Sequence, residues 1–358
     1  MSERAETIDR ETTGAEMCAR PLVSVIVTFY NQAAFVEPTL SSVLAQDYSP
    51  MEVIVVDDGS TDDTPQACAA FSGRVRYVRR SNGGPSAARN EGLRQARGSL
   101  IAHLDGDDLW DPGKITAQVA TALRYPEAGM IVVDGEMFCD GETLRPSLFG
   151  GWISSRLADE SHGAVVVECH EPFVRACLVT TPSQVMFRRE ALERVGTWKE
   201  SVWLTGDHEL YLRITLRYPV AFVRRSLIRY RYGESTLSGP QALRAFRWGL
   251  ERVVMLRSHR HDIPGHRCEA AADQVGRTVA DLTRDAYHRS PTSGRRWAAA
   301  FLCRLAWQSR RPDRVFPYLV ALAVPEGVQR LAARAMRARF LAPSTAREAG
   351  DREGTRLR

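Results

Sequence analysis

The sequence of 358 residues predicts an α/β fold that begins with a parallel, Rossmann-like half. Short apolar runs alternate four times with helical patterns between residues 21 and 110, as in consecutive βαβ units. One run, residues 51–56, is almost continuously apolar, as expected for a strand covered on both faces. Three runs end in polar residues, and α/β sheets bind their ligands at the carboxyl ends of their strands.

This first half is expected to contain four strands and three helices in alternation. Apolar residues at helical spacing mark the first helix, and the hydroxyl residues Thr61 and Ser86 are expected to cap the second and third. The expected strands are residues 21–27, 51–56, 75–78 and 99–104, and the expected helices are residues 33–44, 61–71 and 87–96.

The following part is expected to be less regular, with a weak pattern between residues 140 and 180. We expect helices over 115–124 and 209–217, and strands over 130–136, 184–187, 220–224 and 227–232. The chain is thereby divided into a disordered tail (1–20), an α/β domain (21–237), a helical region (238–342) and a flexible tail (343–358).

Charge is unevenly distributed along the chain. From residue 241 on there are 23 Arg and 11 acidic residues, a surplus of 12 positive charges, so the net charge of +5 leaves residues 1–240 at −7. The basic part is either a solvated helical surface or a face that meets anionic lipid or an acceptor. The polar N-terminus does not resemble a signal peptide, and no apolar run reaches the roughly 20 residues of a membrane-spanning helix.

The seven cysteines are scattered and form no C-x-x-C pair. This distribution favours free thiols in a reducing compartment over a disulfide framework or a zinc site. One group, His259, His261, His266 and Cys268, matches no usual zinc spacing and indicates a polar connection between helices.

An acidic motif, Asp105, Asp107 and Asp108, follows the strand expected over 99–104. Three carboxylates within four residues repel one another unless a cation or hydrogen-bond donors offset their charge. Their hard oxygens suit a divalent cation, and the alternative is an ordinary acidic turn.

Two further strand ends suggest nucleotide binding. Asp58 can accept a hydrogen bond from the imide N–H of a uracil or thymine, and Tyr30 can stack on the base; the alternative is a helix-capping sequence. The loop at Gly83–Gly84 precedes a helix, whose N-terminus suits anions, and Arg89 can reach a ribose or phosphate. Neither a Walker loop nor a G-x-G-x-x-G occurs, which argues against kinases and dinucleotide dehydrogenases.

A later acidic residue, Asp207, lies where a helix is expected to begin. There the helix dipole favours a carboxylate and keeps it ionised, so Asp207 is either a catalytic base or a simple cap.

Four ordered motifs together resemble the family-2 glycosyltransferases of the GT-A fold, over roughly residues 21–235. They are Val23 to Asn31, Val55 to Asp62, Gly83 to Asn90 and Leu104 to Asp108, and the segment Thr205 to Arg213 is similar to the later catalytic segment of the family. The resemblance implies a Rossmann-like nucleotide-binding fold with a mixed central sheet, extended here by the helical region.

By position, the resemblance also implies roles for single residues. Asp207 would be the catalytic base, and Asp105 and Asp107 the D-x-D pair that contacts the ribose and Mg²⁺ or Mn²⁺, with Asp108 as a substitute metal ligand. Tyr30 would stack on the base and Asp58 would read its pyrimidine edge. The nucleotide-sugar site would comprise Thr28, Tyr30, Asn31, Asp58, Arg89, Asp105 and Gly106.

The implied function is metal-dependent, inverting transfer of one sugar from a UDP- or dTDP-linked donor to a hydroxyl of a glycan, a lipid-linked or a small-molecule acceptor. A Q-x-x-R-W motif is missing, which disfavours a processive synthase. We expect no nucleic-acid partner, a cytoplasmic location and peripheral contact of the basic region with anionic membrane. A non-catalytic nucleotide-sugar-binding relative and a sugar nucleotidyltransferase remain as alternatives.

Overall fold

The computed structural model describes residues 20–158, 163–202 and 205–233 of the chain. The described helices are α1 (Ala33–Leu44), α2 (Thr64–Ala69), α3 (Pro85–Gln95), α4 (Lys114–Arg124), α5 (Gly151–Leu157), α6 (His170–Arg175), α7 (Arg189–Val195) and α8 (Gly206–Thr215), with a 3₁₀ turn at Pro182–Gln184. Several expected segments fall outside these residues: the N-terminal tail except for Arg20, the helical region 238–342 with the group His259, His261, His266 and Cys268, and the C-terminal tail.

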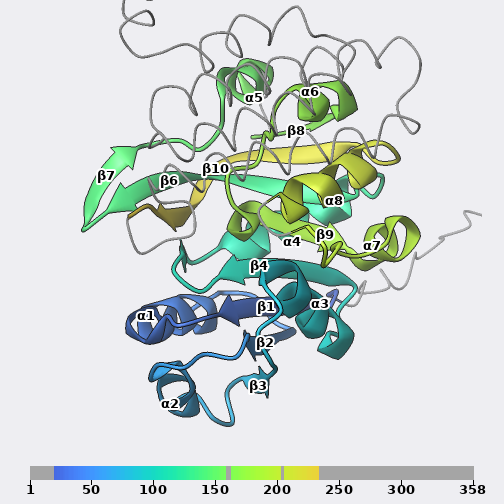
Figure 1. Cartoon of the computed structure of the whole chain (residues 1–358). Coiled ribbons are helices and arrows are strands. Elements are labelled where there is room, and N and C mark those ends of the chain that lie inside the picture. The colour runs from blue at the N-terminus through green and yellow to red at the C-terminus, as the bar shows by residue number, and fades with distance from the viewer. Residues whose placement is uncertain (1–19, 159–162, 203–204, 234–358) are drawn as a thin grey trace, which may run out of the picture. The chain divides into compact units, whose positions relative to one another are not determined.

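The strands join in one sheet in the order β3-β2-β1-β4-β9-β6-β10-β5, with β7 paired to β6 and β8 to β10 (Figure 1). Their bounds are β1 (Val23–Phe29), β2 (Met51–Asp57), β3 (Arg76–Arg79), β4 (Leu100–Asp105), β5 (Leu109–Trp110), β6 (Met130–Cys139), β7 (Glu142–Arg145), β8 (Ala164–Val167), β9 (Val185–Arg188) and β10 (Val220–Arg231).

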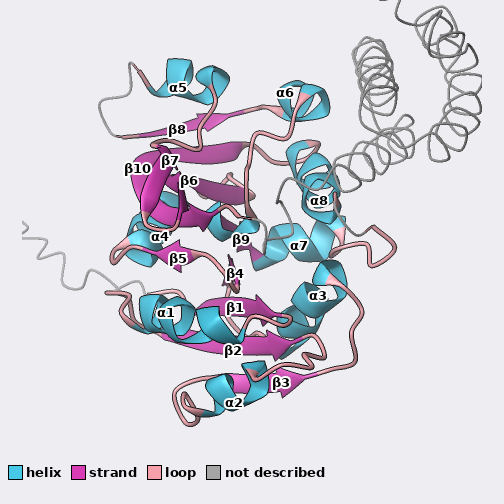
Figure 2. Cartoon of the chain, turned by 60° about the vertical axis from the view of Figure 1, so that its left-hand side comes forward, coloured by secondary structure: helices cyan, strands magenta, loops and turns pink. Residues whose placement is uncertain are grey.

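The sheet is mixed, which confirms the expected α/β fold. The strands β1 to β4 are parallel to one another, whereas β9 runs antiparallel between β4 and β6. α3 packs on β1 and β2, and α4 on β6 and β10 (Figure 2). Almost every residue of β1 is buried, because a parallel strand at the centre of a layered fold has no solvent face.

The register brings the polar strand ends together. Thr28 of β1 pairs with Asp105 of β4, and Phe29 pairs with Asp57 of β2. The backbone N–H of Asp58 donates to the carbonyl of Phe29 at 2.9 Å, so the first two motifs meet directly. The expectation that these motifs share one sheet edge is therefore confirmed.

Two expected helix caps are wrong. α2 begins at Thr64, and the backbone N–H of Thr64 donates to the side chain of Asp62, so Thr61 lies outside the helix. α3 begins at Pro85, after Gly84 with a φ of 88°, and Ser86 lies inside it. Proline suits the first helical position because it lacks the N–H that would be unpaired there.

The two strands expected near 220–232 form one strand, β10, with register shifts at Val223/Ser226 and Ser226/Arg229. The bulges interrupt the alternation of polar and apolar residues in the middle of β10, but the strand continues past them. The helix expected over 209–217 begins earlier, at Gly206.

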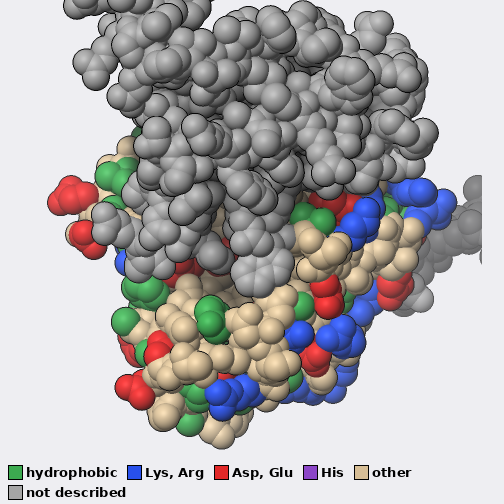
Figure 3. Space-filling model, in the orientation of Figure 1, with side chains coloured by type: hydrophobic (Ala, Val, Ile, Leu, Met, Phe, Trp, Pro, Cys, Tyr) green, Lys and Arg blue, Asp and Glu red, His purple; other side chains and the backbone are tan. Residues whose placement is uncertain are grey.

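Within the described ranges, no helix combines the length and apolar character needed to cross a membrane. Cys68, Cys139 and Cys169 are free thiols. On the face drawn in Figure 3, acidic and basic side chains of the described residues intermingle rather than forming a uniformly basic patch.

Candidate active site

The carboxylates of the acidic motif differ in how exposed they are to solvent. The side chain of Asp105, at the end of β4, is 27% exposed, whereas Asp108 is fully buried. Gly106 permits this turn, because a Cβ atom there would lie 2.4 Å from the ring of Phe29 and 2.7 Å from the carbonyl oxygen of Thr28. Any larger residue at position 106 would push β4 away from β1.

Asp108 has a structural role in place of the expected metal-ligand role. Its carboxylate accepts hydrogen bonds from Thr181 Oγ1 at 2.9 Å, Ser183 Oγ at 2.6 Å and the backbone N–H of Arg231 at 3.0 Å. Both oxygens are thereby engaged with protein donors. To bind a cation, Asp108 would have to give up a buried network, so it is a poor substitute ligand.

Asp105 and Asp107 remain as the carboxylate pair suited to a cation. Burial and the neighbouring charge of Asp105 raise the pKa of Asp107 to about 7. A divalent cation would offset this unfavourable clustering, and carboxylate oxygens are its preferred ligands. In the described part of the chain, no three Asp, Glu, His or Cys side chains are already grouped for a metal ion. The pair therefore needs further ligands from a bound molecule or water.

Asp58 organises the glycine loop. Its side chain accepts hydrogen bonds from Arg80 Nη1 at 2.5 Å and from the backbone N–H groups of Gly84 at 2.8 Å and Gly83 at 3.1 Å. A nucleobase N–H read by Asp58 would share an oxygen with these donors. Arg80 was not identified from the sequence, where it is one of two adjacent arginines after a strand.

The other residues expected to bind the nucleotide differ in whether their side chains already contact the protein. Tyr30 is 48% exposed, so its ring is available for stacking, and Thr28 is half-buried beside Asp105. Asn31 has a φ of 52°, and its amide oxygen accepts from the backbone N–H of Thr61 at 2.7 Å. Asn31 therefore fixes the turn that presents Tyr30.

Arg89 joins the two halves of the site. Its side chain is only 6% exposed and forms ion pairs with Asp105 at 2.7 Å and with Asp207 at 3.2 Å. A buried guanidinium requires such partners, because an unpaired charge is costly to remove from water. Arg89 thus lies between the two carboxylates, and its expected contact with the nucleotide stays a prediction.

Asp207 occupies the first turn of α8, as expected. Burial raises the pKa of Asp207, and Arg89 acts in the opposite direction. The indole N–H of Trp198 donates to Asp207 Oδ1 at 2.7 Å, and Arg89 contacts the same oxygen. Among the described residues no hydrogen bond is formed to the other oxygen, Oδ2, so it is the oxygen placed to accept a proton.

Trp198 is a site residue that the sequence analysis missed. The side-chain amide of Asn90 forms two hydrogen bonds with the backbone of Trp198: it accepts from the N–H at 3.1 Å and donates to the carbonyl oxygen at 2.9 Å. The indole also meets the rings of His103 and Phe187, with centroids 4.6 and 5.7 Å away. No local signal marks Trp198, because its partners lie far away along the chain.

Glu209 is the other carboxylate near the start of α8. It is buried and forms ion pairs with Lys199 and Arg213, each at 2.6 Å. Two cations hold it in place, which makes it a poor candidate for a base.

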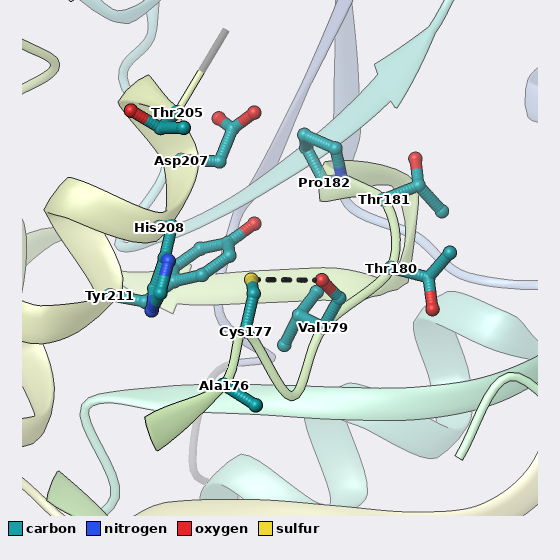
Figure 4. A pocket seen from close by; sticks show the side chains of 10 residues that line it. All are labelled: Ala176, Cys177, Val179, Thr180, Thr181, Pro182, Thr205, Asp207, His208 and Tyr211. Atoms are coloured by element: carbon teal, nitrogen blue, oxygen red, sulfur yellow. Dashed lines mark hydrogen bonds between the residues drawn. The ribbon is translucent and has the colours of Figure 1, made fainter. Parts of the chain in front are cut away.

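A cavity of about 330 Å³ lies beside Asp207 (Figure 4). Its described walls come from α8 and from the loop between α6 and β9. The lining residues are Ala176, Cys177, Val179, Thr180, Thr181, Pro182, Thr205, Asp207, His208 and Tyr211.

Comparison with known proteins identifies relatives of this chain. The model of the family "Glycosyl transferase family 2" matches residues 24–161. An uncharacterized glycosyltransferase of Rickettsia typhi is 29% identical over 211 residues, which cover 59% of this chain and 64% of the relative. The chain thus spans less than two thirds of that relative's length.

Two solved structures share the fold. TarS 1–349 of S. aureus, in complex with UDP-GlcNAc, has a TM-score of 0.58 at 15% identity, over 87% of this chain and 92% of that one. The mannosyltransferase PcManGT of Pyrobaculum calidifontis, in complex with GDP-Man and Mn²⁺, has a TM-score of 0.52 at 21% identity, over 86% and 87%.

Replacing Asp108 by Ala is expected to destabilise the protein, whereas replacing Asp107 by Ala is not. Loss of the Asp108 carboxylate removes the acceptor of two buried donors, Thr181 and Ser183, and of the partly buried N–H of Arg231, and unsatisfied buried groups cost about 1–3 kcal/mol each. Denaturant unfolding measures the difference. Equal stability of the two variants would contradict the structural role of Asp108.

Replacing Trp198 by Phe is expected to raise the pKa of Asp207, because the indole N–H stabilises the charged carboxylate. The pKa is measured from the ¹³C carboxyl shift of Asp207 across a pH titration. Trp152→Phe is the matched control, since Trp152 lies on α5 and packs against Phe222. A pKa that stays constant or falls in Trp198→Phe would show that the hydrogen bond does not act on Asp207.

Proposed function

Residues 24–161 belong to glycosyl transferase family 2, and on this premise we propose that the chain transfers one sugar from a nucleotide-diphosphate sugar to an acceptor hydroxyl, with inversion and without processive extension. The observation that carries the proposal is the Asp105–Arg89–Asp207 arrangement at the carboxyl edge of the sheet. Through Arg89 it connects the acidic pair Asp105 and Asp107, which suits a cation bound to a diphosphate, to Asp207, whose carboxylate suits proton transfer.

Donor binding is assigned to the edge of β1, β2 and β4. Tyr30 offers an exposed ring for the base, and Asp58 offers a carboxylate acceptor that suits the imide N–H of uracil or thymine. We therefore propose a UDP- or dTDP-linked donor. TarS and PcManGT were solved with UDP-GlcNAc and GDP-Man, so relatives of this fold use both kinds of base.

Asp105 and Asp107 would hold Mg²⁺ or Mn²⁺ together with the donor. The cation, when bound, neutralises charge on the diphosphate leaving group. The complex of PcManGT with Mn²⁺ supports the use of a divalent ion in this fold. Arg89 keeps Asp105 fixed by its ion pair, which orients the acidic pair before the donor binds.

Asp207 acts as the general base in this proposal. Its oxygen Oδ2 takes the proton of the acceptor hydroxyl, while Trp198 and Arg89 contact Oδ1. The acceptor oxygen then bonds to the anomeric carbon from the face opposite the diphosphate, and the bond between that carbon and the diphosphate breaks. A single displacement of this kind inverts the anomeric centre.

For location, we propose the cytoplasm, with peripheral contact to anionic membrane. The motivation is the surplus of 12 positive charges from residue 241 on, counted in the sequence alone. The acceptor would be a glycan, a lipid-linked sugar or a small molecule.

Removal of the divalent cation is expected to weaken UDP binding sharply, because two carboxylates and a diphosphate then repel one another. Calorimetry with Mn²⁺ or with EDTA measures the affinity. Asp107→Ala should reproduce the EDTA result, and Asp63→Ala, an exposed carboxylate on α2's N-terminal side, should not. Equal affinity with and without metal would refute the metal role.

Replacing Asp207 by Asn is expected to lower turnover by about 10²–10⁴ while UDP affinity is retained. Asn keeps the size of the side chain and an oxygen acceptor for Trp198, so the fold should survive. Transfer is measured with a panel of UDP- and dTDP-sugars. Near wild-type turnover in Asp207→Asn would assign the base to another group.

A further inference from the structure

We propose that the cavity beside Asp207 binds one neutral, hydroxyl-bearing ring of the acceptor, and that the hydroxyl of Tyr211 recognises one of its hydroxyl groups. This inference rests on the proposed function, because it assigns the substrate class on the base side of the same site. The cavity has a volume of about 330 Å³ (Figure 4). Ligand pockets span about 300–1,000 Å³, so a cavity of this size suits one ring rather than an extended chain.

Tyr211 provides the first argument. Its side chain is fully buried, and its ring lies 6.2 Å from Phe187 in a stacked geometry and 6.1 Å from Phe173 edge-on. Its hydroxyl is buried and has no hydrogen-bond partner in the described part of the chain. A buried hydroxyl without a partner is destabilising, and a hydrogen bond from a ligand hydroxyl in the cavity would remove that penalty.

The position of Tyr211 on α8 provides the second argument. Asp207 and Tyr211 are four residues apart, so their side chains lie on one face of the helix, and both line the cavity (Figure 4). A ring bound against Tyr211 therefore shares a wall with the carboxylate that the proposed function makes the base. This adjacency favours the acceptor as the occupant.

The chemistry of the walls provides the third argument. Apart from Asp207 and His208, the described lining residues are uncharged, and no Lys or Arg is among them. A phosphate or carboxylate would therefore have no cation to meet. Thr180 and Thr181 add hydroxyl groups, whereas Ala176, Val179 and Pro182 add apolar surface. This mixture matches a sugar ring, which has hydroxyl groups and apolar C–H faces.

Cys177 supplies a built-in probe, because its thiol belongs to a lining residue of the cavity. The full chain is treated with N-ethylmaleimide in the presence of D-glucose, D-galactose or N-acetylglucosamine, without nucleotide, and labelling is followed by peptide mass spectrometry. At least one sugar should slow labelling of Cys177 but not of Cys139, which lies at the end of β6. The same sugars are titrated in ligand-detected NMR, which does not depend on thiol reactivity.

Two variants test the role of Tyr211. Tyr211→Phe keeps the packed ring and should raise the sugar concentration needed for half-saturation about 3- to 10-fold, the loss expected for one hydrogen bond. Tyr48→Phe is the matched control, because the Tyr48 hydroxyl donates to the carbonyl of Pro21, outside the cavity lining. Equal sugar binding by Tyr211→Phe and the wild type would overturn the role of Tyr211.

The remaining outcomes separate this inference from the proposed function. Absence of binding by all three sugars in both measurements overturns the inference, while UDP binding with Mn²⁺ would leave the proposed function standing. If the sugars bind but UDP does not, the proposed transfer fails and the cavity assignment survives. If UDP-sugars protect Cys177 and neither UDP nor free sugars do, the cavity holds the donor sugar and the acceptor assignment is wrong.

Discussion

One buried cation, the guanidinium of Arg89, holds the candidate site together. It lies on α3 and shares its charge between Asp105 at the end of β4 and Asp207 on α8. Removing one partner from a buried ion pair costs about 3–5 kcal/mol, because the other charge is then left without compensation. β4 and α8 are therefore both held by the side chain of Arg89. In the proposed function, these two ion pairs set the distance between the acidic pair that would bind the donor and the base, Asp207.

The acidic turn after β4 follows from a second constraint, the close approach of two strand ends. Gly106 lies so near Phe29 that no side chain fits there, and the turn then directs Asp108 inward. Thr181 and Ser183 satisfy that buried carboxylate. Because Thr181 also lines the cavity, the same hydrogen bonds position a cavity wall beside the acidic pair. The carboxyl edge of the sheet and the cavity therefore depend on one hydrogen-bond network.

Much of the fold could be predicted, because its strands are buried and its turns have local chemistry. The apolar runs at β1, β2 and β4 and the polar residues after them were recognised correctly. Helix caps were harder, since Thr61 and Ser86 are good capping residues that the structure uses for other hydrogen bonds. For the bulged strand β10 the sequence predicts two strands, because the polar residues in its middle resemble a turn.

By itself the sequence determined the order of the motifs, the α/β class and the residue types at the carboxyl edge, because strand periodicity and turn chemistry are local properties. Only the tertiary structure decided what each polar group contacts. Asn90 reaches the backbone of Trp198 across 108 residues, and Trp198 in turn binds Asp207. The pKa of Asp207 likewise depends on burial, which raises it. Desolvation and long-range hydrogen bonds arise only when distant segments pack together, so no local pattern could encode them.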